Sequence, residues 1–249
     1  MIKQLCFAAL MAVAALGTTG CSSAKKESVA ANSALPKLTN DVHWFRNAAE
    51  HKAVYAQTYA DAAEELERLA AGKTPGTWAV SLDADETVLD NSQYQKELIL
   101  SGATYSDETW NVWCERREAK ALPGSKAYLE KVRALGGKIV IVSNRYTETQ
   151  QATEDNLRQL ELPFDLVMLR QGKPDKQKER RWNEVTSGTT PAGWPAMPIL
   201  QYLGDNIEDF PELEQGIRSE GEAALTPFGK TYFAFPNPMY GSWPANPQD

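Results

Sequence analysis

Two short acidic segments, far apart in the chain, constrain its fold more than any other feature. Each segment holds two aspartates and directly follows an apolar run: Asp83 and Asp85 come after residues 78–82, and Asp205 and Asp209 come after residues 199–203. Short apolar runs of this kind are typical of buried central strands in a parallel sheet. Because ligands gather at the carboxyl ends of such strands, we expect the four carboxylates to meet in one cleft.

Four carboxylates in one cleft would repel one another unless a cation lay among them. Carboxylate oxygens are hard ligands of the kind that Mg²⁺ prefers. The two segments therefore predict a Mg²⁺ site at this edge of the sheet, with metal-assisted chemistry on an anionic substrate.

Length and composition are those of an ordinary globular protein. The 249 residues are enough for one α/β domain with an insertion, or for two domains at most. Apolar residues make up 42% and charged residues 24% of the chain. The net charge is −7 and no basic stripe is present, which argues against non-specific binding of nucleic acid.

The N-terminal residues have the pattern of an export signal. Lys3 precedes an apolar stretch at residues 5–16 that is too short to span a bilayer, so we expect residues 1–20 to be a signal peptide. Cys21 then resembles the acylated cysteine of a bacterial lipobox, although Thr18 stands where an aliphatic residue is usual. An ordinary cleaved signal peptide is the alternative. We expect an exported lipoprotein, anchored to the outer membrane or facing the periplasm.

The rest of the chain is expected to be a tether and one folded domain. Residues 21–40 are small and polar and suit a tether, and residues 41–249 form the domain. With Cys6 lost in the signal and Cys21 lipidated, Cys114 would be the only thiol of that domain and a packing residue.

Helical and strand-like segments alternate along the domain. Apolar residues from Phe45 to Leu69 recur at helical spacing until Gly72, which predicts one long helix. Residues 90–122 have no strand-like run and are expected to form a helical insertion over the cleft, so that a small cap comprises residues 41–76 and 90–122. Five strands are predicted, at residues 78–82, 138–142, 166–169, 199–203 and 231–235.

Helices are expected between these strands, over residues 123–136, from a capping box at residues 147–150, and over residues 176–185. Strands separated by helices indicate an α/β fold, a doubly wound parallel sheet with a small helical cap.

The Asp-x-Asp pair suits phosphoryl transfer. Asp83 and Asp85 lie two apart on an extended strand end, so their side chains can point the same way. Phosphoryl transfer needs a nucleophile, a metal on the phosphate oxygens and a proton donor for the leaving oxygen. The first carboxylate could attack phosphorus while the second protonates the departing alkoxide. Solvated loop acids are the alternative, since Asp is common in turns.

Two further groups follow later strands. Ser143 and Asn144 come after residues 138–142, where a hydroxyl and backbone amides can bind phosphate oxygens. Lys178 lies early in the next helical segment, and its ammonium would neutralise charge on a phosphoryl group. A solvated basic helix face is the alternative for this lysine.

These residues together resemble the haloacid dehalogenase (HAD) superfamily. Four motifs match in order: Asp-x-Asp-x-Thr at residues 83–87, Ser143, Lys178, and Gly-Asp-Asn-x-x-Asp at residues 204–209. The string Asp-Glu-Thr-x-Leu-Asp-Asn-Ser at residues 85–92 narrows the resemblance to bacterial class C acid phosphatases, the lipoprotein-type 5′-nucleotidases also called DDDD phosphatases. Further matches lie at residues 50–53, 110–113, 121–124, 142–145, 229–231 and 236–243.

The resemblance implies a role for each site residue. Asp83 would be the nucleophile that forms an aspartyl-phosphate, and Asp85 the general acid and base. Mg²⁺ would be held by the Asp83 side chain, the Asp85 backbone carbonyl and the Asp205 side chain, with Asp209 close by. Phosphoryl-binding groups would be Ser143, Asn144 and Lys178. Trp110 and Tyr240 match aromatics that sandwich a nucleobase or aromatic leaving group, unless they are ordinary core residues.

The resemblance also implies the activity, that of an exported Mg²⁺-dependent acid phosphatase and 5′-nucleotidase, and it suggests a homodimer. Two departures from the family pattern are Ala84, where an aliphatic residue is usual, and a slightly short segment that leaves Lys176 as an alternative to Lys178. A non-catalytic surface-binding lipoprotein is the main alternative function. Asp85 argues against a dehalogenase, and a phosphonatase would need a Schiff-base lysine in the cap.

Overall fold

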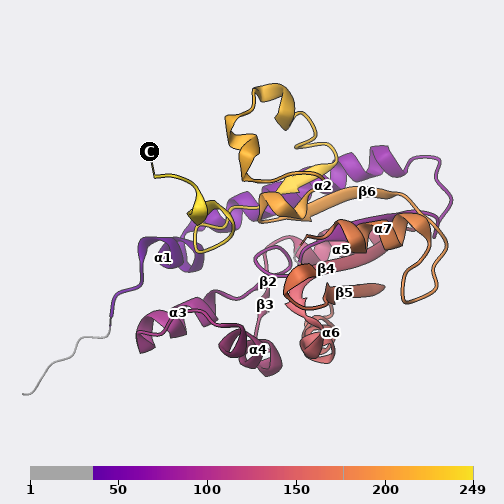
Figure 1. Cartoon of the computed structure of the whole chain (residues 1–249). Helices are drawn as coiled ribbons and strands as arrows, with labels where there is room; N and C mark the ends of the chain where they lie inside the picture. Colours follow the sequence, from indigo (N-terminus) through magenta and orange to yellow (C-terminus); the bar gives the residue numbers. More distant parts are fainter. Residues whose placement is uncertain (1–35, 176, 249) are drawn as a thin grey trace, which may run out of the picture. The chain divides into compact units, whose positions relative to one another are not determined.

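The computed structural model describes residues 36–175 and 177–248 of the chain (Figure 1). All of them belong to one compact unit. The expected signal peptide at residues 1–20, Cys21, most of the tether and Lys176 lie outside the described residues. Among the described helices, none combines the length and the apolar character that a membrane crossing requires.

A five-stranded parallel sheet forms the centre of the domain. Its order is β5-β4-β1-β6-β7, with the strands at Leu166–Arg170, Lys138–Tyr146, Ala79–Leu82, Ile199–Gly204 and Tyr232–Ala234. This confirms the predicted doubly wound α/β fold. The two acidic segments follow β1 and β6, which are neighbours, so their aspartates emerge at the same edge of the sheet.

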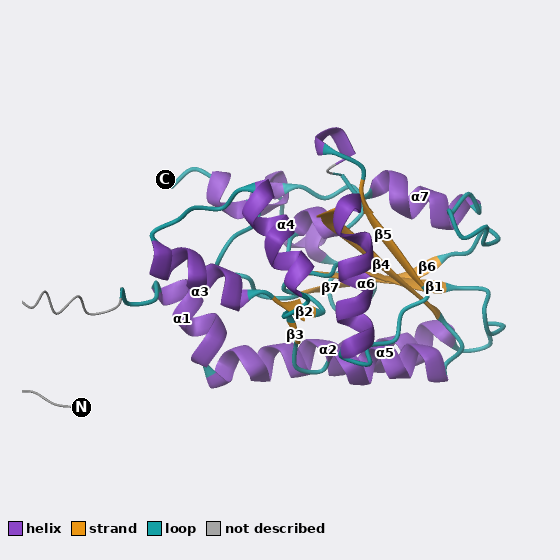
Figure 2. Ribbon diagram, turned by 90° about the horizontal axis from the view of Figure 1, so that it is seen from below, coloured by secondary structure: helices purple, strands orange, loops and turns teal. Residues whose placement is uncertain are grey.

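Alternate residues of the central strands face two layers of helices. Val80, Leu82 and Ile141 pack against α2 (Ala49–Ala70) and α5 (Ser125–Ala134), which lie side by side in Figure 2. Ala79 and Val140 instead pack against Trp182 of α7 (Glu179–Ser187). Residues i and i+2 of a strand share a face, so a continuous apolar run can bury both sides of the sheet.

The long helix predicted from Phe45 is in fact two helices. α1 (Asn40–Asn47) and α2 are separated at Ala48, whose backbone is extended (φ −74°, ψ 135°). In a continuous helix Phe45 and His51 would lie on different faces, whereas the break brings their ring centroids to 4.1 Å. α2 packs on α5 and the sheet rather than with the cap, so the expected cap segment at residues 41–76 is divided.

The insertion at residues 90–122 is helical, as predicted. It contains α3 (Ser92–Ser101) and α4 (Asp107–Arg116), which Figure 1 shows as a group of helices beside the sheet. Two short antiparallel strands, β2 (Leu89–Asp90) and β3 (Lys120–Ala121), close the insertion at its base. These two-residue strands were not predicted, because each is too short to show a periodic pattern.

Three further element boundaries differ from the prediction by three or four residues. β4 continues to Tyr146, because it pairs with β5 beyond the end of β1, so Ser143 and Asn144 lie within a strand. The predicted capping box at residues 147–150 is wrong, because no side chain caps the start of a helix there. Residues Thr147–Thr149 form a 3-10 turn, in which the Thr149 hydroxyl donates to the Tyr146 carbonyl, and α6 (Gln150–Gln159) begins after this turn. α7 begins at Glu179.

Gly204, at the end of β6, offers a test of how closely the acidic segment packs. A Cβ atom at this position would lie 2.2 Å from the Cβ atom of Asp209. We expect Gly204→Ala to destabilise the fold by roughly 1–3 kcal/mol, as other overpacked sites do. Urea unfolding measures the change, with Gly221→Ala as the control because no atom lies within 4 Å of its added Cβ. Equal stability of the two variants would contradict this packing.

Candidate active site

Three of the predicted carboxylates meet at the ends of β1 and β6. Oxygen atoms of Asp83, Asp205 and Asp209 all lie within 4.8 Å of one another. Asp83 and Asp205 directly follow their strands, and Asp209 ends the 3-10 turn Ile207–Asp209. The donors are the hard oxygen atoms that suit a divalent cation, so this cluster could hold a metal ion.

Lys178 lies between two of these carboxylates. Its Nζ is 2.5 Å from Asp83 Oδ1 and 2.7 Å from Asp209 Oδ1, and the side chain is only 2% exposed. One ammonium cannot balance three carboxylates, so two negative charges stay uncompensated when all three are ionised. That deficit equals the charge of one divalent cation, which supports a metal site at this place.

Burial perturbs the ionisation of the cluster. It raises the pKa of Asp83 to about 7, even though Lys178 acts in the opposite direction, and Asp209 and Asp85 add to the rise. The pKa of Asp205 is raised well above its usual value for the same reason, with Asp209 as the main neighbouring charge. Burial disfavours the charged form of Lys178, but Asp209 and Asp83 outweigh it and raise the pKa of the ammonium. A cation bound here would therefore compete with protons.

All four carboxylates line one cavity, as predicted, but the Asp85 side chain lies outside the three-carboxylate cluster. It is held instead by Arg145, whose Nε and Nη2 atoms lie 2.9 and 2.7 Å from Asp85 Oδ1. Asn91 Nδ2 donates to the same oxygen at 2.8 Å. The guanidinium is 1% exposed, and a buried arginine attracts a carboxylate away from a repulsive cluster.

The loop between Asp83 and Asn91 is fixed from two directions. Tyr55 and Tyr59 of α2 donate hydrogen bonds to the backbone carbonyls of Glu86 (2.5 Å) and Thr87 (2.7 Å). The fully buried Glu86 accepts a hydrogen bond from the Asn91 backbone N–H, and burial raises the pKa of its carboxyl well above the usual range. The catalytic candidates thus stand on a loop that the core holds rigidly.

Asn91 also connects this loop to the cap. Its Oδ1 accepts hydrogen bonds from Trp113 Nε1 of α4 at 2.8 Å and from Arg145 Nη2 at 3.1 Å. The same side chain therefore contacts the Asp85 carboxylate, the arginine that holds it, and a tryptophan of the cap.

The two groups predicted to bind phosphate from β4 have different surroundings. Ser143 is fully buried, and its Oγ lies 3.4 Å from Asp85 Oδ2. Asn144 lines the cavity above the carboxylates, and its Oδ1 accepts a hydrogen bond from Arg181 at 2.8 Å. Of the pair, Asn144 presents a side chain to the cavity.

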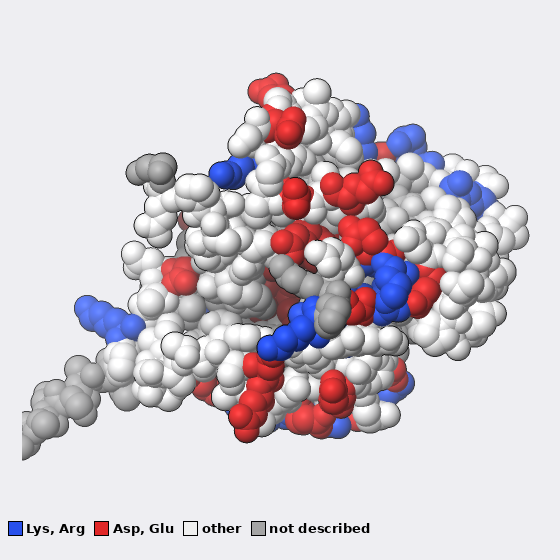
Figure 3. Space-filling view, in the orientation of Figure 1, with Lys and Arg blue, Asp and Glu red and all other residues white. Residues whose placement is uncertain are grey.

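A cavity of about 650 Å³ opens over the carboxylates. Acidic side chains gather near the middle of the corresponding face in Figure 3. The strand ends contribute polar groups to the cavity, and its aromatic groups come from the cap and from the C-terminal segment. Its lining is Asp83, Asp85, Gln95, Leu98, Thr104, Tyr105, Trp110, Asn144, Arg170, Asp205, Asn206, Asp209, Met239, Tyr240 and Gly241.

Both predicted stacking residues face this cavity. Trp110 packs edge-on against Tyr94, with ring centroids 5.1 Å apart, and is otherwise nearly buried. The Tyr240 hydroxyl is buried and has no hydrogen-bond partner among the described residues. A flat ring entering the cavity would meet aromatic surface from both.

Several site residues were missed from the sequence. Arg145, Asn91 and Arg170 were given no role, and neither was Asn237, which donates to Asp205 Oδ2 at 2.8 Å. Arg170 could have been found, because it directly follows the strand predicted at residues 166–169, as the aspartates follow theirs, and it proves to be the last residue of β5. The pairing of Arg145 with Asp85 has no such signal, because it depends on how far β4 extends past β1.

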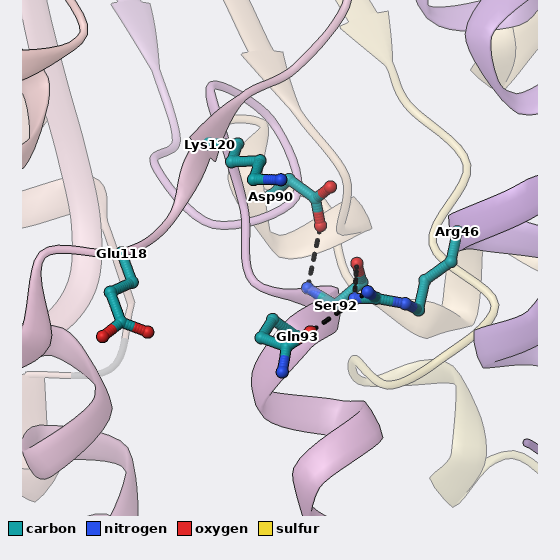
Figure 4. A pocket seen from close by; sticks show the side chains of 6 residues that line it. All are labelled: Arg46, Asp90, Ser92, Gln93, Glu118 and Lys120. Carbon is teal, nitrogen blue, oxygen red and sulfur yellow. Dashed lines mark hydrogen bonds between the residues drawn. The ribbon is translucent and has the colours of Figure 1, made fainter.

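A second cavity lies beside the base of the cap (Figure 4) and has a volume of about 480 Å³. It is lined by Arg46, Asp90, Ser92, Gln93, Glu118 and Lys120. Arg46 donates to Ser92 Oγ and Gln93 Oε1, at 3.0 and 3.1 Å. This cavity lacks the buried carboxylate cluster, so we assign the active site to the larger one.

The fold and the carboxylate cluster define a HAD-like phosphatase. The class C acid phosphatase from Bacillus anthracis is similar, with a TM-score of 0.72 and 33% identity over 82% of this chain and 84% of that one. Its structure with tungstate bound gives a TM-score of 0.70 and 32% identity over the same shares. Residues 11–243 match the family described as HAD superfamily, subfamily IIIB (Acid phosphatase), and the chain belongs to this family.

Two plant proteins are also similar over parts of the chain. The Stem 31 kDa glycoprotein of Glycine max is 32% identical over 74 residues, which is 30% of this chain and 29% of that protein. The Stem 28 kDa glycoprotein of Glycine max is 25% identical over 164 residues, 66% of this chain and 59% of that protein. The family confirms the resemblance to acid phosphatases and places the chain among phosphoric monoester hydrolases.

The raised pKa values predict how a metal affects stability. Asp83 has a pKa of about 7 in the folded protein against an ordinary 3.8, so between these values the folded state binds a proton that the unfolded state does not. The free energy of unfolding of the metal-free protein should therefore fall as pH rises from about 4 to about 7. Added Mg²⁺ should raise the melting temperature more at about pH 7 than at about pH 5, because fewer protons then compete.

Thermal unfolding in EDTA and in Mg²⁺ at both pH values measures this effect. Asp83→Asn is the matched variant and should show a flatter pH dependence and a smaller gain from Mg²⁺. The same gain at both pH values would contradict the assignment of the cluster as a metal site.

Proposed function

We propose that this protein is a Mg²⁺-dependent acid phosphatase with 5′-nucleotidase activity that forms an aspartyl-phosphate on Asp83. The observation that carries the proposal is the position of Asp83, which contacts a buried lysine and lies beside two further aspartates at the floor of a cavity. Nucleoside monophosphates and aryl phosphates are the proposed substrates, since the cavity joins this floor to an aromatic wall.

The metal would be held by Asp83 and Asp205, with Asp209 close by and the Asp85 backbone carbonyl as the ligand that the family resemblance implies. Mg²⁺ would neutralise charge on the phosphate oxygens and on the attacking carboxylate. The Bacillus anthracis class C acid phosphatase has been solved with tungstate bound. Tungstate is tetrahedral like phosphate, which supports a phosphate-like anion as a ligand of this fold.

Asp83 is suited to attack phosphorus. Lys178 contacts its Oδ1, so the other carboxylate oxygen can form the new bond to phosphorus while the bond from phosphorus to the leaving oxygen breaks. Lys178 balances charge on both the carboxylate and the phosphoryl group, and Asn144, whose side chain faces the cavity, binds phosphoryl oxygens. The buried Ser143 would contact the phosphoryl group only together with Asp85, to which its hydroxyl lies close. Water then attacks the aspartyl-phosphate, which releases phosphate and restores Asp83.

Asp85 is suited to move the proton in both steps. It gives a proton to the departing alkoxide in the first step and takes one from the attacking water in the second. Arg145 and Asn91 hold its carboxylate beside the cavity and apart from the metal cluster. Asp83 and Asp85 therefore have separate environments, which suits a nucleophile and a proton carrier placed side by side.

The proposal extends to recognition and location. Trp110 and Tyr240 would stack on the base or aryl ring, as their place in the cavity wall allows. The sequence pattern of residues 1–20 supports export, and Cys21 supports a lipid anchor. The proposed location is the outer membrane or the periplasm. A homodimer rests on the family resemblance alone.

Asp83→Asn and Asp85→Asn test the two catalytic roles. Asp83→Asn should lower kcat for every phosphomonoester by at least about a thousandfold, because the nucleophile is lost. Asp85→Asn should lower kcat about 10²–10⁴-fold for nucleotides, and much less for p-nitrophenyl phosphate, whose leaving group departs without protonation. Phosphate release in Mg²⁺ and in EDTA, from acidic to neutral pH, measures both effects.

Asp155→Asn is the matched control, because Asp155 is a carboxylate on α6 that does not line the cavity. It should keep the original rates, and every variant should still unfold in one cooperative thermal transition, which shows that it is folded. Near-normal turnover in Asp83→Asn, or equal losses for both substrates in Asp85→Asn, would contradict the proposed mechanism.

Trp110→Ala tests the stacking role. We expect kcat/KM for a nucleoside monophosphate to fall about tenfold, since base stacking on an aromatic side chain contributes roughly 1–3 kcal/mol. A small aliphatic phosphate should be affected far less. Steady-state kinetics with both substrates measures the difference. Equal losses of kcat/KM for the two substrates would show that Trp110 only packs in the cap and does not stack on the base.

A further inference from the structure

Arg170, the last residue of β5, lines the active-site cavity without an acidic partner. Its guanidinium carbon lies 4.1 Å from the centre of the Tyr146 ring. Its Nε atom is buried and makes no hydrogen bond, and within residues 36–175 and 177–248 no carboxylate forms an ion pair with it. A buried donor left unpaired carries a desolvation cost that a bound acceptor would remove.

Neighbouring cations at the site are already paired. Lys178 contacts Asp83 and Asp209, and Arg145 is held by Asp85. Both of these cations thus have carboxylate partners, and the proposed mechanism gives Arg170 no role.

Asp107, at the start of α4, is engaged elsewhere. Its two oxygens accept hydrogen bonds from Tyr105 and Tyr146, each at 3.0 Å, and Lys173 Nζ lies 3.5 Å away. Tyr146 thus contacts Asp107 through its hydroxyl and Arg170 through its ring. This arrangement holds Arg170 at the cavity wall without supplying the anion that a guanidinium binds best.

The position of Arg170 separates it from the reacting group. β5 is two strands from β1 in the sheet, and Arg170 pairs with Tyr146, well beyond the level at which β1 ends. At a strand spacing of about 4.8 Å, its backbone is roughly 10 Å from that of Asp83. An anion bound to Arg170 can therefore be a second group, distinct from the phosphoryl group on Asp83.

We propose that Arg170 recognises a second anionic group, a phosphate or a carboxylate, on the leaving group of the substrate. A guanidinium presents a planar fork that suits both kinds of anion. The enzyme would then prefer phosphomonoesters that carry two anionic groups, with a ring between them beside Trp110. This inference rests on the proposed function, since it assumes that the scissile phosphoryl group lies at Asp83.

Paired substrates test the proposal. Adenosine 3′,5′-bisphosphate is compared with 5′-AMP for a second phosphate, and 4-carboxyphenyl phosphate with phenyl phosphate for a carboxylate. The measured quantity is the ratio of kcat/KM values within each pair, with chromatography to show that the 5′-phosphate is released. We expect the ratio to exceed one for at least one pair, and the pair that shows it identifies the anion.

Arg170→Met should lower that ratio about tenfold, mainly through KM, because a charge-assisted hydrogen bond is lost. Arg170→Lys should retain part of the preference. Lys173→Met is the matched control: it removes the same charge from a side chain that is 83% exposed and does not line the cavity, and it should leave the ratio unchanged. Thermal unfolding confirms that each variant is folded.

Ratios near one for both pairs in the original protein would overturn the proposal. Equal losses for both members of a pair in Arg170→Met would also overturn it, because Arg170 would then act on the scissile phosphoryl group or on the fold. An equal drop in Lys173→Met would show a diffuse charge effect instead. Failure to hydrolyse any monoester would be a different result, since it would contradict the proposed function itself.

Discussion

The contact of Lys178 with Asp83 and Asp209 is the interaction on which the rest of the site depends. Three carboxylates are buried together at the strand ends, and one ammonium compensates only part of their charge. Buried charges are tolerated only where partners are close, so this arrangement requires further positive charge. A divalent cation would supply it. Under the proposed function, a substrate anion would reach the floor of the cavity only together with that cation, because of the same shortage of positive charge.

The fold keeps two neighbouring aspartates in different environments. Asp83 ends the central strand and turns toward β6, where the other acids and Lys178 lie. Asp85 turns toward β4, where Arg145 holds it. The loop cannot exchange these positions easily, because Tyr55 and Tyr59 of α2 fix its carbonyl groups. The separation of the proposed nucleophile from the proposed proton carrier is thus a property of the whole sheet and its helices.

Much of this arrangement was predictable from the sequence, and the reasons are physical. Apolar runs that end in acids gave the strands β1 and β6, and parallel strands bring their carboxyl ends together whatever their separation in the chain. The partner of Asp85 was not predictable, because Arg145 reaches it only through the extension of β4 beside β5. The helix break at Ala48 was missed as well, since it reflects the packing of Phe45 on His51 rather than any breaker residue. Family resemblance, more than the basic run around it, singled out Lys178.

The contacts of Asn91 have a consequence for the timing of catalysis. Its amide donates to Asp85, and its oxygen accepts from Trp113 in the same helix as Trp110. A leaving group that shifts this helix would loosen Asn91 and so disturb Asp85, the carboxylate proposed to carry the proton. Substrates that fit the cap would leave Asn91 and Asp85 in place, whereas poorly fitting substrates would displace them. Selectivity can in this way appear in the rate of the chemical step as well as in binding.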